Sequence, residues 1–127
     1  MKNKSKVPYY NKEEELLIIK RYQELILYVY QLMKKFPNTE IFSLTSDIKR
    51  NLFLGMENLV FAKRVEKDEK KFYYLIKVET HLNIMKIFVR IAKKNKYINS
   101  RNYTAWSYKI AEIDNMLSKW RKACQKQ

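Results

Sequence analysis

The stretch YTAWSYKIAEIDNMLSKW, residues 103–120, decides the fold class, because its large apolar residues return at alternating steps of three and four. These residues are Tyr103, Trp106, Ile110, Ile113, Leu117 and Trp120. Such steps place side chains on one stripe of an α-helix, and they are the spacing of helices that pack in bundles. The stretch therefore predicts an amphipathic helix with one face buried.

Three further segments carry nearly the same spacing. Their apolar stripes are Ile18, Tyr22, Leu25, Val29, Leu32 and Phe36; Leu44, Ile48, Leu52, Gly55, Leu59 and Ala62; and Leu75, Val78, Leu82, Met85, Val89 and Ala92. The four stripes predict helices at about 12–35, 42–66, 70–94 and 100–123, each roughly 35 Å long. Equal helices with short connections predict an all-α fold, an up-down-up-down antiparallel four-helix bundle that forms a single domain over residues 1–127.

Short-range signals mark the starts of three helices. Asn11 followed by Glu14 has the spacing of a capping box, in which two side chains satisfy backbone N–H groups reciprocally. Ser43 or Thr39 is available to cap the second helix, and Ser100 is available to cap the fourth. We therefore expect a capped start for each of these helices.

The chain has a single glycine, Gly55, and it lies on the apolar stripe of the second helix. A helix-interior glycine costs about 1 kcal/mol relative to alanine, so we expect a neighbouring helix to approach closely there. The scarcity of glycine also excludes dinucleotide-binding fingerprints and P-loops, which need several glycines where backbone approaches phosphate.

Residues for catalysis are scarce. One histidine and one cysteine cannot form a zinc site or a disulfide framework. Glu79 and His81 are two positions apart and face different sides of a helix, so they do not form the Glu-x-x-His motif of di-iron bundles. We expect Glu79 to pair with a basic residue, His81 to lie at the surface, and Cys124 to be unreactive. The sequence thus predicts a protein that is not an enzyme, with no catalytic residue, metal or cofactor.

The N-terminal sequence and the lengths of the apolar stretches indicate where in the cell the protein is expected. The basic N-terminus is followed by charged residues and not by an apolar run, so we expect no signal peptide. The longest apolar stretch is far too short to span a bilayer. We therefore expect a cytoplasmic protein that does not enter a membrane.

Positive charge is concentrated in the last third of a chain whose net charge is +14. Residues 86–127 contain 11 of the 27 lysines and arginines and only two acidic residues. The candidate contacts to nucleic acid or to a protein partner are Lys86, Arg90, Lys93, Lys94, Lys96, Arg101, Lys119, Arg121 and Lys122. This asymmetry favours phosphate-directed binding of RNA or DNA that weakens steeply with salt. The alternative is a solubilising surface in a lysine-rich composition without a binding role.

Aromatic and aliphatic residues remain outside the four stripes. Tyr9, Tyr10, Tyr97 and Tyr108 could stack on bases or pack at helix or subunit edges. The apolar surplus consists of Ile19, Ile26, Leu27, Tyr30, Phe53, Phe61, Ile84, Phe88 and Ile91. Because large exposed apolar surfaces mark protein contacts, we expect a homo-oligomer in which each subunit contacts neighbours on two sides and a ring closes.

Several of these segments resemble a known family. KFP at 35–37 and FSLTSDIKR at 42–50 resemble four-helix-bundle proteins encoded in intervening sequences of bacterial 23S ribosomal RNA genes. LNIMKIFVRIA at 82–92 and the stretch at 103–120 are more similar to the accessory variability determinant (Avd) of diversity-generating retroelements. The resemblance covers roughly residues 12–122. It departs from the family near the end of the chain, where Asp114, Asn115 and Ser118-Lys119 replace the Gly, Arg and Gly-Gly that the family often has.

The resemblance implies a function. It implies a homopentameric barrel of four-helix bundles that binds the reverse transcriptase of the retroelement and nucleic acid, and that supports mutagenic copying of template-repeat RNA into cDNA. Arg90 matches a basic position of the family's third helix and is the best single candidate contact. The alternatives are an oligomer of the ribosomal intervening-sequence type, whose role is undefined, and a structural oligomer whose basicity is incidental.

Overall fold

The structure is a computed structural model that describes residues 11–125, and these residues form four long α-helices and no strand. The helices are α1 (Lys12–Met33), α2 (Leu44–Arg64), α3 (Asp68–Lys94) and α4 (Ser100–Gln125). A short 3-10 helix, η2 (Asn38–Glu40), lies in the connection between α1 and α2. The predicted all-α fold of four helices is confirmed.

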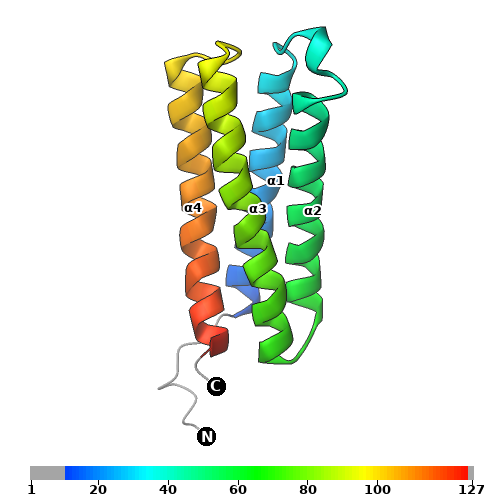
Figure 1. Cartoon of the computed structure of the whole chain (residues 1–127). Helices are drawn as coiled ribbons and strands as arrows, with labels where there is room; N and C mark the ends of the chain where they lie inside the picture. The colour runs from blue at the N-terminus through cyan, green and yellow to red at the C-terminus, as the bar shows by residue number, and fades with distance from the viewer. Residues whose placement is uncertain (1–10, 126–127) are drawn as a thin grey trace, which may run out of the picture.

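The helices form an antiparallel square (Figure 1). Each helix packs against two others: α1 on α2, α2 on α3, α3 on α4, and α4 back on α1. The α1–α2 and α3–α4 connections lie together at one end of the bundle, and the α2–α3 turn lies at the other end (Figure 1). Residues on those first two connections therefore share one end surface.

The core consists of the four predicted stripes. Every stripe residue is buried except Leu44 and Tyr103, which are half-buried. Trp106, Trp120 and Tyr22 are the largest fully buried side chains. A fully buried large apolar side chain contributes about 1.5–3 kcal/mol, so these stripes supply most of the stabilisation of the bundle.

Gly55 has a different packing role from the one its sequence position predicts. A side chain, and not a neighbouring helix backbone, fills the space beside it: a Cβ atom at Gly55 would overlap the phenol oxygen of Tyr22 from α1. That hydroxyl donates a hydrogen bond of 3.0 Å to the backbone carbonyl of Leu52. Because the surroundings are apolar, burial raises the pKa of Tyr22 above its ordinary value.

The capping box at the start of α1 is confirmed. The backbone N–H of Glu14 donates to Asn11 Oδ1 at 2.9 Å, and the backbone N–H of Asn11 donates to Glu14 Oε1 at 3.1 Å. Three glutamates lie in the first turn of α1, where the helix dipole favours negative charge.

Two other cap predictions are wrong. Ser43 precedes α2, but its side chain caps no backbone group; the carboxylate of Glu40 instead accepts the N–H of Leu44 at 3.3 Å. Ser100 lies inside α4, whose start is capped by Asn99, since Asn99 Oδ1 accepts a backbone N–H three residues on at 2.8 Å. In both places a neighbouring residue with a longer side chain reaches the open N–H groups.

Candidate nucleic-acid interface

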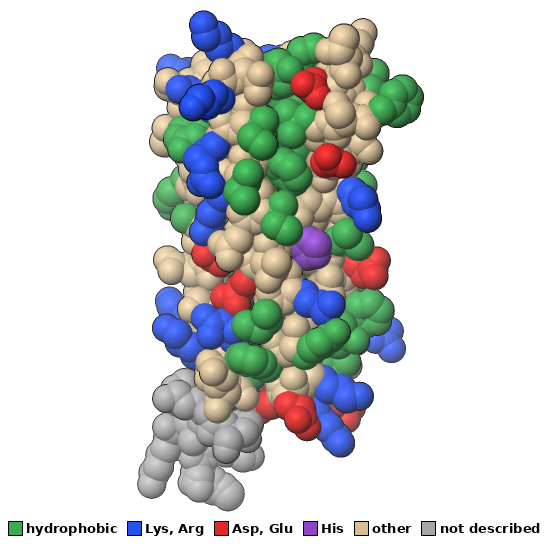
Figure 2. Space-filling model, in the orientation of Figure 1, with side chains coloured by type: hydrophobic (Ala, Val, Ile, Leu, Met, Phe, Trp, Pro, Cys, Tyr) green, Lys and Arg blue, Asp and Glu red, His purple; other side chains and the backbone are tan. Residues whose placement is uncertain are grey.

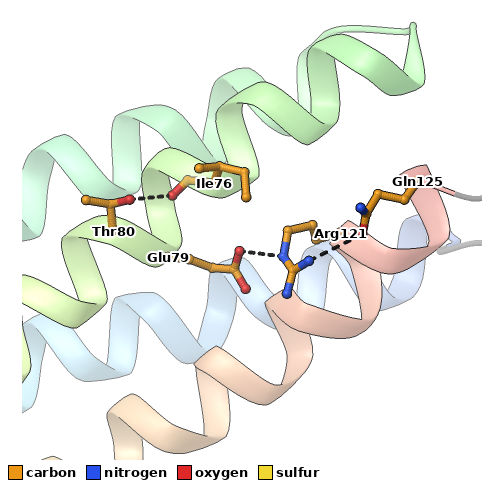
Figure 3. A network of polar contacts seen from close by, with 5 residues as sticks. All are labelled: Ile76, Glu79, Thr80, Arg121 and Gln125. Carbon is orange, nitrogen blue, oxygen red and sulfur yellow. Dashed lines mark hydrogen bonds and ion pairs between the residues drawn. The ribbon is translucent and has the colours of Figure 1, made fainter.

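The groove between α3 and α4 contains an ion pair that removes one predicted contact residue from the free surface. Arg121 Nε donates to Glu79 Oε1 at 2.7 Å, and Arg121 also contacts Gln125 at 3.3 Å (Figure 3). The predicted pairing of Glu79 with a basic residue is thereby confirmed. Burial raises the pKa of Glu79, and the Arg121 charge opposes that rise.

Lys86 lies in the same groove, one turn before Arg90 on α3. Its ammonium is 3.4 Å from Asp114 Oδ2 on α4 and 3.3 Å from the side-chain oxygen of Asn83. Lys86 and Arg121 thus join α3 to α4, and their positive charges are largely balanced by carboxylates.

The α3–α4 turn begins with a hydrogen-bonded motif that ends α3, and lysine side chains lie in and beside it. The backbone N–H of Tyr97 donates to the carbonyl of Ala92 at 2.9 Å, and that of Lys96 donates to Lys93 at 3.0 Å, the two bonds of a Schellman motif. The motif places Lys96 in the left-handed region with φ 63°. The turn is therefore fixed by backbone hydrogen bonds, although a lysine occupies the position that usually holds glycine.

Five of the predicted contacts gather at this end of the bundle, and we call them the turn cluster. They are Arg90, Lys93, Lys94, Lys96 and Arg101. All are exposed except Lys93, which is half-buried with its ammonium 5.7 Å from the centroid of the Tyr103 ring. None of the five forms an ion pair with a carboxylate among residues 11–125. Figure 2 shows lysine and arginine side chains gathered toward the α4 edge of this view and toward this end.

The remaining two predicted contacts lie at the other end. Lys119 and Lys122 are exposed near the end of α4, roughly 30 Å along the helix from Arg101 at about 1.5 Å per residue. The structure therefore divides the nine predicted cations into the turn cluster, two groove residues that are paired, and two cations at the far end of α4.

The outward surface of α4 carries no acidic residue, a feature that composition alone did not reveal. Its exposed residues are Ser100, Arg101, Thr104, Tyr108, Ala111, Asn115, Lys119, Lys122 and Gln125. The two acids of α4 are half-buried and paired, Glu112 with Arg21 of α1 at 3.4 Å and Asp114 with Lys86. We call this surface the α4 stripe; in contrast, α1, α2 and α3 each expose at least one carboxylate.

The candidate tyrosines differ in accessibility. Tyr9 and Tyr10 lie outside the described residues. Tyr97 is half-buried, and its hydroxyl donates to Glu40 Oε2 at 2.6 Å, a bond that raises the pKa of the phenol and joins the two connections at this end. Tyr108 is 67 % exposed on the α4 stripe, so among the described candidates it alone presents an open ring.

His81 lies at the surface, as predicted, but its ring is tied to a neighbouring helix (Figure 2). The ring is half-buried, and its Nδ1 lies 2.8 Å from the side-chain oxygen of Asn51 on α2. The amide of Asn51 donates in turn to the backbone carbonyl of His81 at 2.9 Å, which assigns the amide orientation and makes Nδ1 the protonated nitrogen. Desolvation, with help from the charge of Lys77, lowers the pKa of His81. The residue therefore links α2 and α3.

Two of the residue types that support catalysis or metal binding can be placed within the described residues. Cys124 is buried, and burial raises the pKa of its thiol to about 11, which agrees with the expected lack of reactivity. Within residues 11–125, no set of three or more His, Cys, Asp or Glu side chains is placed to hold a metal ion. No helix in that range has the length and hydropathy needed to cross a bilayer.

The predicted apolar surplus is largely exposed on two adjacent sides of the bundle. Leu27, Phe53, Phe61, Ile84 and Ile91 are exposed, whereas Ile19, Ile26, Tyr30 and Phe88 are half-buried. On the α1–α2 side Phe53 lies 6.3 Å from Tyr30, and on the α2–α3 side Phe61 stacks on Tyr74 at 5.2 Å between ring centroids. Figure 2 shows apolar side chains along the centre of this face, over α3.

Sequence reasoning missed further exposed apolar residues. They are Leu16, Leu17, Ile41, Phe42, Ile76 and Ile87. All lie outside the four stripes, so counting apolar residues off the stripes would have found them. Phe42, at the start of the α2 segment, is 95 % exposed.

Comparison with models of protein families assigns the chain to a family. A family model described as bAvd-like matches residues 16–124, which is most of the chain and spans all four helices. No curated protein matches the chain.

Proposed function

Because the chain belongs to the bAvd-like family, we propose that it is a non-enzymatic accessory protein of a diversity-generating retroelement. In this role it forms a ring of identical subunits. It binds the reverse transcriptase and nucleic acid during mutagenic cDNA synthesis in the cytoplasm. The observation that carries the proposal is the make-up of two surfaces: the exposed residues of α4 include cations and no carboxylate and adjoin the turn cluster, whereas α1, α2 and α3 each expose several large apolar side chains.

The nucleic-acid contact is electrostatic. Exposed cations without acidic partners attract phosphates and release counterions, and the association constant then falls steeply with salt. The turn cluster supplies four exposed cations and the half-buried Lys93 near one end, and the α4 stripe adds no carboxylate that would repel the phosphate backbone. These contacts position the nucleic acid and do not read its sequence.

The exposed apolar side chains support a ring. They lie on the α1–α2 and α2–α3 sides, which share α2 and offer one contact surface to each of two neighbours. The family's homopentamer is our proposal for the number of subunits. In such a ring α2 faces the centre and α4 faces outward, which leaves the α4 stripe open to solvent.

The reverse transcriptase is expected to contact the end that carries the turn cluster. Phe42 is 95 % exposed there, beside Ile41, and the Tyr97–Glu40 hydrogen bond ties this connection to the basic turn. An exposed aromatic ring can fill an apolar pocket on a protein partner, and the cations at the same end can contact the nucleic acid that the polymerase binds. Phe42→Ser should reduce capture of the polymerase while leaving ring mass and nucleic-acid affinity unchanged; unchanged capture would place the contact elsewhere.

The test of the whole proposal is light scattering for mass, followed by binding of RNA and of the reverse transcriptase across a salt series. Arg90→Glu with Arg101→Glu should abolish RNA binding at moderate salt and reduce the salt slope by about two, one for each lost phosphate contact. The matched control is Lys67→Glu with Lys70→Glu, an equal charge change at exposed positions near the other end. A monomer that binds no polymerase, or equal losses in both double variants, would overturn the proposal.

A further inference from the structure

Tyr108 has the properties of a binding residue and no evident structural role. Its ring is 67 % exposed, and it has no hydrogen bond, ring contact or cation contact with any residue of the described chain. Tyr28, Tyr30, Tyr73, Tyr74, Tyr97 and Tyr103 each have such a contact. Most of the Tyr108 ring is therefore free to contact a ligand.

The surroundings of Tyr108 favour a ligand that has both phosphate groups and planar aromatic rings. The ring borders an open hollow on the outward surface of α4, whose other lining residues are Ser100, Arg101, Thr104 and Ala105. Arg101 supplies a guanidinium for a phosphate, and the two hydroxyls supply hydrogen-bond donors. Small side chains around the ring leave its face accessible, and no carboxylate borders the hollow.

We propose that Tyr108 and Arg101 form a subsite for unpaired nucleotides, in which a base stacks on the Tyr108 ring while Arg101 binds a neighbouring phosphate. This proposal rests on the nucleic-acid binding proposed above and adds that the bound strand is single-stranded at this point. The α4 stripe exposes cations and no carboxylate, which favours nucleic acid over a protein partner at Tyr108. A surface that binds a protein can contain carboxylates, whereas a carboxylate beside a phosphate backbone repels it.

The physical reason for the preference is the geometry of stacking. A base in a duplex has both faces covered by its neighbours, whereas an unpaired base can turn one face to an aromatic ring. Removal of one stacking ring weakens single-strand binding about 5- to 100-fold, whereas a duplex, held through its phosphates, is insensitive to the ring.

The experiment measures binding of a labelled oligothymidylate and of a DNA duplex of equal length to the full chain by fluorescence anisotropy, at two salt concentrations. Tyr108→Ala should weaken oligothymidylate binding by about 5- to 100-fold, with duplex affinity and salt slope unchanged. Tyr108→Trp should preserve the affinity, and Asn115→Ala, on the same stripe without a ring or charge, should have no effect. An abasic strand should bind the wild-type chain as weakly as oligothymidylate binds Tyr108→Ala.

The outcomes separate this inference from the proposed function. Equal losses for single strand and duplex, or no loss for either in Tyr108→Ala, would overturn the stacking role while the salt-dependent binding stands. A loss of polymerase capture in Tyr108→Ala without any change in nucleic-acid affinity would assign the ring to the protein partner and would also overturn it. A wild-type chain that binds neither probe would refute the proposed function and the subsite together.

Discussion

The substitution Gly55→Ala tests the packing at the centre of the bundle. A Cβ atom at this position would overlap the phenol oxygen of Tyr22 and would lie 2.9 Å from the ring carbon Cζ that carries it. Tyr22 is fully buried, so the ring cannot retreat without disturbing its neighbours. The added methyl group therefore overpacks the core, whereas at an exposed helix position it would stabilise the protein.

The magnitude follows from three contributions. Overpacking costs about 1–3 kcal/mol. Displacement of the ring breaks the bond from its hydroxyl to the Leu52 carbonyl, at a cost of about 0.5–1.5 kcal/mol. The higher helix propensity of alanine returns about 1 kcal/mol. The expected net loss in the free energy of unfolding is about 0.5–3.5 kcal/mol.

The assay is urea denaturation followed by circular dichroism at a fixed protomer concentration, because oligomer stability depends on concentration. A second background gives the decisive comparison. Leucine at position 22 lacks the outer ring atoms that would meet the new methyl group, so Gly55→Ala in a Tyr22→Leu chain should stabilise by about 1 kcal/mol. The same substitution thus changes sign between the two backgrounds. If Gly55→Ala stabilises the wild-type chain, or has equal effects in both backgrounds, the packing argument fails.

Three further predictions concern single residues. The pKa of His81 is lowered in the folded chain, so its contribution to stability is complete above its ordinary pKa and is lost as pH falls from there through the lower pKa of the folded state; the urea midpoint should fall as pH drops below about 6.5, and His81→Gln should reduce that fall. Lys96→Gly should stabilise by about 0.5–1 kcal/mol by relieving the left-handed backbone, whereas Lys96→Ala, which removes the same charge, should not; equal midpoints for the two would contradict this. Cys124, with its pKa near 11 and its buried position, should resist a thiol reagent at pH 8 in the folded protein and react once urea unfolds the chain; fast labelling of the folded protein would show that the thiol is accessible.

The fold could be predicted because burial repeats with helical period. Trp106 and Ile110 lie on one face by spacing alone, and a continuous stripe of this kind has no other stable arrangement in water. The helix starts were less predictable, since the cap depends on which side chain reaches the open N–H groups. Glu40 does so from three residues before Ser43, and Asn99 does so from the position directly before Ser100.

The candidate site was predictable in composition and only partly in arrangement. The excess of positive charge in the last third identifies the turn cluster, because a short turn necessarily brings Lys94 and Arg101 to one end. Sequence spacing does not show which cations pair with a carboxylate on another helix. The sequence therefore could not show that Arg121 pairs with Glu79 whereas Lys122 stays exposed. The exposure of a single side chain is also not predictable from sequence. Tyr97 and Tyr108 both lie off the apolar stripes, and only their tertiary contacts show which ring is open to solvent.

The contact between Tyr22 and Gly55 also fixes how far along their axes α1 and α2 are placed. Stripes that repeat about every seven residues could slide by one repeat and still bury aliphatic side chains against one another. After such a slide the phenol would meet Ile48 or Ala62 instead of the single glycine, and its hydroxyl would lose the Leu52 carbonyl. One residue without a side chain thus selects one axial register among several of similar hydrophobic energy, and it keeps the Phe42 connection level with the α3–α4 turn.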